Sequence, residues 1–164
     1  MTTRDSQRSR VYTAENDWAL GLDAARRGAR RATVAGSSVL LPEERLFGSL
    51  ESAQEYATAL LLAVPAATDS AYPPVLLRRR KGHRQAHWEP PGVIALPVPE
   101  HGQPWALRES VLLHELAHHV AFHRHGVVDH GESYRACMLE LVEQALGPEA
   151  ALALRVAYGE QRLV

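Results

Sequence analysis

The chain has 164 residues and a formal net charge of −1, with 46% hydrophobic and 23% charged residues. This length predicts one folded domain with a substantial core, and the balanced charge gives no global indication of a nucleic-acid or membrane partner. No apolar stretch approaches the ~20 residues of a membrane span, and residues 1–10 lack the apolar core of a signal peptide. We therefore expect a cytoplasmic protein with a polar tail at residues 1–10 and a single domain at residues 11–164.

The first two thirds of the chain alternate between helical and extended patterns. Two helices are predicted, one from about Thr13 to Arg27 with Thr13 as its N-cap, and one over residues 52–64. Short β-branched and apolar runs predict strands at residues 32–35, 39–41, 75–80, 85–88 and 93–96. We expect the last three to form a small antiparallel sheet. Residues 93–97 are either its edge strand, to which an extended peptide substrate could add, or an ordinary core strand.

The next predicted helix, from about residue 106 to 125, carries the most informative motif. It reads His114-Glu115-Leu116-Ala117-His118, an H-E-x-x-H pattern that no Pro or Gly interrupts before Gly126. Histidines at i and i+4 lie on one face of a helix and can share one metal ion, while the adjacent glutamate can act on a water held there. The alternative is a buried helix with two hydrogen-bonded histidines, but burying these groups without a metal would be costly. The pattern therefore favours a zinc hydrolase with Glu115 as general base.

A catalytic zinc usually takes a third protein ligand, which this helix cannot supply. After Gly126 the chain must turn back, and Asp129 with Glu132 resembles a capping box that opens a second helix ending at Gly147-Pro148. His130 lies at the start of that helix and is the favoured third ligand. The competing candidates are Glu140 and Glu143, whose ordinary interpretation is a charged outer face. Tyr134 is a candidate donor to a developing oxyanion, or else a core aromatic. Cys137 is expected to be a small core residue.

The stretch from His114 to Tyr134 reads H-E-L-A-H, eleven residues, then H-G-x-x-Y. It resembles SprT-like and related minimal zinc metallopeptidases, and also an actinobacterial family of small metallohydrolases with no assigned substrate. The resemblance implies an α+β, zincin-like domain, in which a short antiparallel sheet packs on the active-site helix and an antiparallel helix follows. It also implies that His114, His118 and His130 are zinc ligands and that Glu115 is the catalytic base. The Cys-x-x-Cys zinc ribbon of many SprT-like proteins is missing, because the chain has one cysteine.

Two functions follow from these patterns. The first is a zinc-dependent metallohydrolase that cleaves peptide bonds in a peptide or protein substrate. The second is a non-catalytic module built on structural zinc, associated with DNA through a basic cluster whose ordinary interpretation is a solvated hairpin. That cluster comprises Arg78, Arg79, Arg80, Lys81 and Arg84. A fourth ligand or a buried Glu115 would favour the structural site, whereas an open coordination position beside Glu115 would favour the enzyme.

Overall fold

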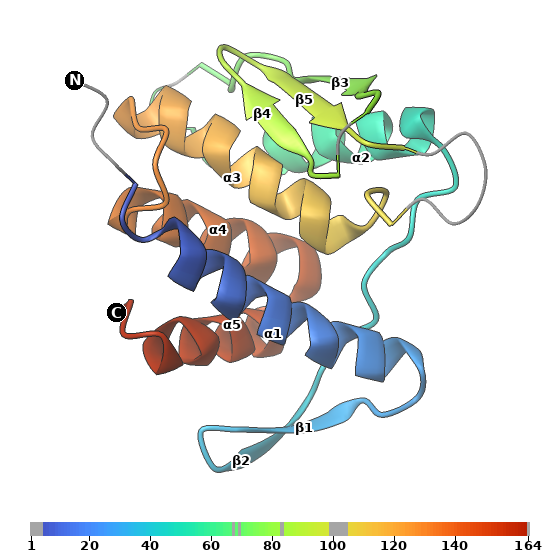
Figure 1. Ribbon diagram of the computed structural model, residues 1–164, viewed down its shortest axis with the longest axis vertical. Coiled ribbons are helices and arrows are strands. Elements are labelled where there is room, and N and C mark those ends of the chain that lie inside the picture. The colour runs from blue at the N-terminus through green and yellow to red at the C-terminus, as the bar shows by residue number, and fades with distance from the viewer. Residues whose placement is uncertain (1–4, 67, 69, 83, 99–104, 164) are drawn as a thin grey trace. The chain divides into compact units, whose positions relative to one another are not determined.

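The computed structural model describes residues 5–66, 68, 70–82, 84–98 and 105–163. These residues form an α+β fold, which confirms the predicted class (Figure 1). The helices are α1 (Arg8–Arg26), α2 (Leu50–Ala63), α3 (Glu109–His125), α4 (Glu132–Leu146) and α5 (Pro148–Glu160). The strands are β1 (Arg31–Val34), β2 (Ser37–Leu40), β3 (Leu76–Arg79), β4 (His87–Glu89) and β5 (Val93–Leu96). In the described part of the chain, no helix has the length and apolar character needed to span a bilayer.

The chain divides into two compact units, one formed by residues 1–44 with 129–164 and the other by residues 45–128. In the first unit, α5 packs against both α1 and α4 (Figure 1). The two short strands predicted near residues 32–41 are present as β1 and β2, which pair in an antiparallel hairpin. Helix α1 starts five residues before the predicted N-cap, Thr13, whose hydroxyl instead donates to the Ser9 carbonyl at 3.0 Å inside the helix. A carboxylate oxygen of Asp5 accepts from the backbone N–H of Arg8 at 3.1 Å, which satisfies a donor of the first turn.

Helix α4 begins later than the predicted capping box requires. Its N-cap is Gly131, and no side chain caps it. The Asp129 carboxylate accepts from the Gly131 backbone N–H at 2.8 Å, so it stabilises the turn before the helix instead of the first helical turn. The helix ends at Gly147, whose φ of 92° favours glycine, and Pro148 then occupies the first turn of α5, where its missing N–H costs nothing.

In the second unit, the three-stranded sheet has the order β3-β5-β4. Strand β5 is parallel to β3 and antiparallel to β4, with Val93 opposite both Leu76 and Glu89. The expectation of an antiparallel sheet is therefore wrong, because the sheet is mixed. Of the two alternatives for residues 93–97, the core strand is the one observed: residues 93–96 form the central strand, not an edge that a peptide could join. The physical reason is that Val93–Leu96 is an unbroken apolar run that is buried on both faces of the sheet, as parallel strands usually are.

Helix α3 is held in this unit at its start and along its side. Its first residue, Glu109, donates its backbone N–H to the Arg45 carbonyl at 3.0 Å, and Phe47 donates to the Leu107 carbonyl at 2.8 Å. Strand β4 packs on the helix through Trp88, whose ring centroid lies 5.2 Å from that of Phe122. The helix ends at Gly126, whose φ of 70° is the left-handed C-cap conformation.

Candidate metal centre

Helix α3 places the two motif histidines one turn apart on a buried face. The ring centroids of His114 and His118 are 5.1 Å apart, and the two residues are 6% and 8% exposed. The Trp88 ring stacks beside His118 with centroids 6.3 Å apart and ring planes 15° from parallel. Glu115 is also buried, at 5% exposed. Two imidazoles and a carboxylate thus share the interior with apolar neighbours, an arrangement that is costly unless each polar group is satisfied.

Two further histidines of α3 bind backbone carbonyls instead. His119 donates from Nε2 to the Pro73 carbonyl at 2.8 Å, and its Nδ1 accepts from the Trp88 indole N–H at 3.3 Å. Both nitrogens are therefore engaged, and burial lowers the pKa of His119 to about 4, so the ring is neutral near pH 7. His123 donates from Nε2 to the Pro91 carbonyl at 2.6 Å. Through these bonds, both histidines connect α3 to the segments that contain Pro73 and Pro91.

His130 lies in the turn that leads into α4 and is 5% exposed. Its Nδ1 lies 2.6 Å from a carboxylate oxygen of Asp5, and its backbone N–H donates to the same oxygen at 3.1 Å. Partial burial would raise the pKa of Asp5, but the hydrogen bonds and charge of His130 outweigh it and hold that pKa below its ordinary value. The Asp5 carboxylate thus contacts both the imidazole and the backbone of His130.

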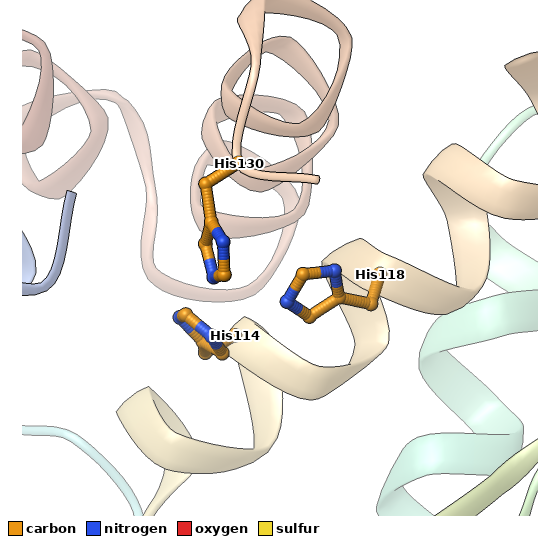
Figure 2. A group of neighbouring side chains, drawn as sticks. All are labelled: His114, His118 and His130. Atoms are coloured by element: carbon orange, nitrogen blue, oxygen red, sulfur yellow. The ribbon is translucent and has the colours of Figure 1, made fainter. Parts of the chain in front are cut away.

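The structure brings together the three histidines predicted from the sequence. One ligand nitrogen from each of His114, His118 and His130 lies within 4.8 Å of the other two. Figure 2 shows the three rings turned toward one another, two from α3 and one from the segment before α4. Three buried imidazoles at this separation could hold a metal ion. A tetrahedral zinc with Zn–N bonds of about 2.0–2.1 Å separates its ligand nitrogens by about 3.3 Å, a spacing that the 4.8 Å limit includes.

The competing third ligands do not join this group. Among the described residues, the only set of three or more candidate ligands consists of the three histidines. Glu143 is exposed and Glu140 is half-buried. Both lie on α4, beyond the turn that contains His130. Cys137 is buried as expected of a core residue.

Tyr134 contributes its hydroxyl to a buried network in the first unit. It donates to a carboxylate oxygen of Glu15 at 3.0 Å, and the Tyr158 hydroxyl donates to the same oxygen at 2.7 Å. Burial and the adjacent Glu15 carboxylate raise the pKa of Tyr158 above its ordinary value, so its hydroxyl stays protonated as a donor. This bond supports the core-aromatic interpretation of Tyr134, and its role as an oxyanion donor stays a prediction.

The basic cluster is partly engaged within its own sheet. Arg78 forms a 2.6 Å ion pair with Glu89, and Arg80 donates to the Gln85 carbonyl at 2.9 Å. The side chains of Arg79, Lys81 and Arg84 are exposed. Paired cations contribute less to a phosphate-binding surface. The segment is exposed as the solvated interpretation expects, but it is not a hairpin, because β5 lies between β3 and β4 in the sheet.

The contact of Asp5 with His130 is the feature of this region that the sequence did not predict. Asp5 lies 125 positions before its partner His130, and a single acidic residue in a polar segment carries no recognisable motif. Comparison with known proteins does not supply further site residues. No protein-family model matches the chain, and no curated protein or solved structure gives a significant match. Function is therefore inferred from the residues of the chain itself.

Proposed function

We propose that this chain is a zinc-dependent metallohydrolase that cleaves peptide bonds. The observation that carries the proposal is the buried group of His114, His118 and His130, with Glu115 directly following the first of these on the same helix. Three imidazoles are a ligand set that suits zinc and leaves one coordination position for water or substrate. Within the described residues, no fourth histidine, cysteine or carboxylate joins the group, as an open catalytic position requires.

The chain's own residues have distinct roles in this mechanism. His114, His118 and His130 would hold the ion, which when bound lowers the pKa of water to about 7 and polarises a carbonyl. Glu115 accepts the proton of the attacking water on its carboxylate and delivers it to the leaving amine, so it ends the cycle ionised as it began. Because Glu115 is buried, the proton transfer takes place away from bulk water. The lower dielectric constant there strengthens the interaction between the carboxylate charge and the transferred proton.

The substrate class rests on the resemblance of His114–Tyr134 to minimal zinc metallopeptidases. Such enzymes bind an extended peptide along a sheet edge near the active-site helix, and addition to an edge uses main-chain hydrogen bonds that tolerate many sequences. Because β5 is central, the edge that packs on α3 is β4 (His87–Glu89). We therefore assign the peptide to β4 and not to residues 93–97.

One observation favours the alternative, a non-catalytic structural metal site. Glu115 is 5% exposed, and a buried glutamate is what a closed structural site would show. Against it stand the ligand types: structural zinc sites usually close with four protein ligands and favour cysteine. The three-histidine group has neither feature among the described residues. The enzyme remains the better-supported function.

Metal analysis and a conservative substitution test the proposal together. Mass spectrometry should find about one zinc per wild-type chain, loss of it in His130→Ala, and retention in the control Glu140→Ala. Zinc lost from Glu140→Ala instead would transfer the third-ligand role to the glutamate. Glu115→Gln should keep its zinc and lose hydrolysis of an unstructured protein such as casein. Full activity of that variant would exclude Glu115 as the base, and zinc without activity in the wild type towards any peptide would favour the structural site.

A further inference from the structure

We propose that Asp5 is a positioning residue for the metal centre, holding His130 in the tautomer and orientation that the third ligand needs. This inference rests on the proposed function, since it concerns how one of its ligands is prepared. Asp5 lies in the segment before α1 and is not part of the H-E-x-x-H motif or of the segment that contains His130. What identifies it is a pair of contacts to one residue of the histidine group, within a single compact unit of the chain.

The two oxygens of the Asp5 carboxylate contact different groups. Oδ2 lies 2.6 Å from the Nδ1 of His130 and 3.1 Å from its backbone nitrogen, so it fixes both the ring and the turn that carries it. Oδ1 accepts from the backbone N–H groups of Gln7 and Arg8 at 3.3 and 3.1 Å. Because Oδ1 is anchored to the start of α1, Oδ2 cannot rotate away from the imidazole without breaking those bonds.

An ionised carboxylate has no proton to donate and can only accept hydrogen bonds. The 2.6 Å contact with ionised Asp5 therefore requires the proton of His130 to be on Nδ1. The lone pair of the neutral ring is then on Nε2, and the negative charge behind the ring makes Nε2 a more basic ligand. Such outer-shell carboxylates typically contribute 10–100-fold to metal affinity.

A second side chain holds the same segment in place. The Arg135 guanidinium donates to the His130 carbonyl at 3.0 Å and also to the Gln7 side-chain oxygen. Arg135 is 9% exposed although it carries a charge, so these contacts are made in the interior and not on a hydrated surface. The segment around Asp5 and the turn around His130 are thus joined at two points, which makes the Asp5 contact a built feature of the fold.

The test measures zinc affinity by competition with a chromophoric chelator. Asp5→Ser keeps an oxygen that can cap α1 but removes the second oxygen, and Asp5→Asn keeps the shape but removes the charge. Both should weaken zinc binding by about 10–100-fold. The matched control is Asp17→Asn on the exposed face of α1, which should bind as the wild type does. Thermal unfolding of the metal-free proteins shows whether each variant is folded.

A second readout follows the imidazole itself. In ¹⁵N-histidine NMR spectra, wild-type His130 should show a protonated Nδ1 in the metal-free and zinc-loaded protein, and Asp5→Ser should lose that signature. Folded Asp5 variants that bind zinc as tightly as the wild type would overturn the positioning role and leave the three-histidine site standing. A wild type that binds no zinc would overturn both this inference and the proposed function.

Discussion

Replacing Tyr56 with phenylalanine tests the buried carboxylate that anchors the first turn of α3, five residues before His114. Glu109 is fully buried and accepts three hydrogen bonds: from the Arg45 backbone N–H at 2.7 Å, from the Arg45 guanidinium at 2.7 Å, and from the Tyr56 hydroxyl at 2.6 Å. Hydrogen bonds to charged groups contribute about 1.5–3 kcal/mol. Tyr56 is only half-buried, so water can partly replace its hydroxyl, and we expect Tyr56→Phe to cost about 1.5 kcal/mol.

For a chain of this length, 1 kcal/mol corresponds to about 2–4 °C in Tm, so the expected loss is about 3–6 °C. The exposed Glu55→Gln on the same helix is the control, and should stay within about 0.5 kcal/mol of the wild type. Combining Tyr56→Phe with Glu109→Gln completes a double-mutant cycle that isolates the contact from the loss of volume. Calorimetry near pH 7 gives the first comparison, and unfolding in urea gives the free energies.

The pH dependence of the same pair is more decisive. Burial, followed by the charge of Glu109, raises the pKa of Tyr56 above its ordinary value of 10.0. Above pH 10 the unfolded tyrosine therefore loses its proton while the folded one keeps it. The wild type then loses about 1.4 kcal/mol per pH unit that Tyr56→Phe does not lose. The stability gap should almost vanish by about pH 11. A gap that stays constant between pH 8 and pH 11, or that widens, would refute this account.

Three further variants or treatments have definite expected outcomes. Trp88→Phe leaves the buried Nδ1 of His119 without its donor, so unfolding in urea should show a loss of about 1–3 kcal/mol; an unchanged midpoint would contradict that bond. Tyr134→Phe removes one of two donors to buried Glu15 and should cost about 1.5–3 kcal/mol at full zinc content; unchanged stability with lost hydrolysis would instead support an oxyanion role. Removing zinc with a chelator should lower Tm by about 5–11 °C relative to protein with zinc at 100 times Kd; a Tm independent of zinc would argue against binding to the folded state.

Local patterns predicted the helix that carries the site almost completely. The uninterrupted apolar run, the H-E-x-x-H spacing and Gly126 predicted residues 106–125, and the helix spans Glu109–His125. The strands β1 and β2 were also predicted, because Gly36 separates two short extended runs in the sequence; in the structure its φ of 80° forms the turn between them. In each case the signal lies within a few residues, where helix periodicity and turn geometry act directly.

Errors arose where distant segments meet. The order of the three-stranded sheet depends on which strands pair, and pairing between segments leaves only a weak trace in the sequence. The sequence did contain one indication of the order: Val93–Leu96 does not alternate between apolar and polar residues, which is typical of a central strand with both faces covered. One error is local: the pattern predicts Asp129 as a helix cap, but its carboxylate accepts from the backbone N–H two residues ahead in a turn, because the same side chain can stabilise either structure. No sequence pattern indicates the contact of Asp5 with His130, since the two residues are separated by most of the chain.

The stacking of Trp88 on His118 also gives the molecule an intrinsic optical reporter. The sequence has three tryptophans. Trp18 donates its indole N–H to the Ala150 carbonyl on α5, and Trp105 is 46% exposed, so neither has a described contact to the histidine group. The Trp88 ring centroid lies 6.3 Å from that of His118, an imidazole that would bind the ion. Its fluorescence should therefore change as that ring is loaded, so the filling of the centre could be followed in real time on unlabelled protein.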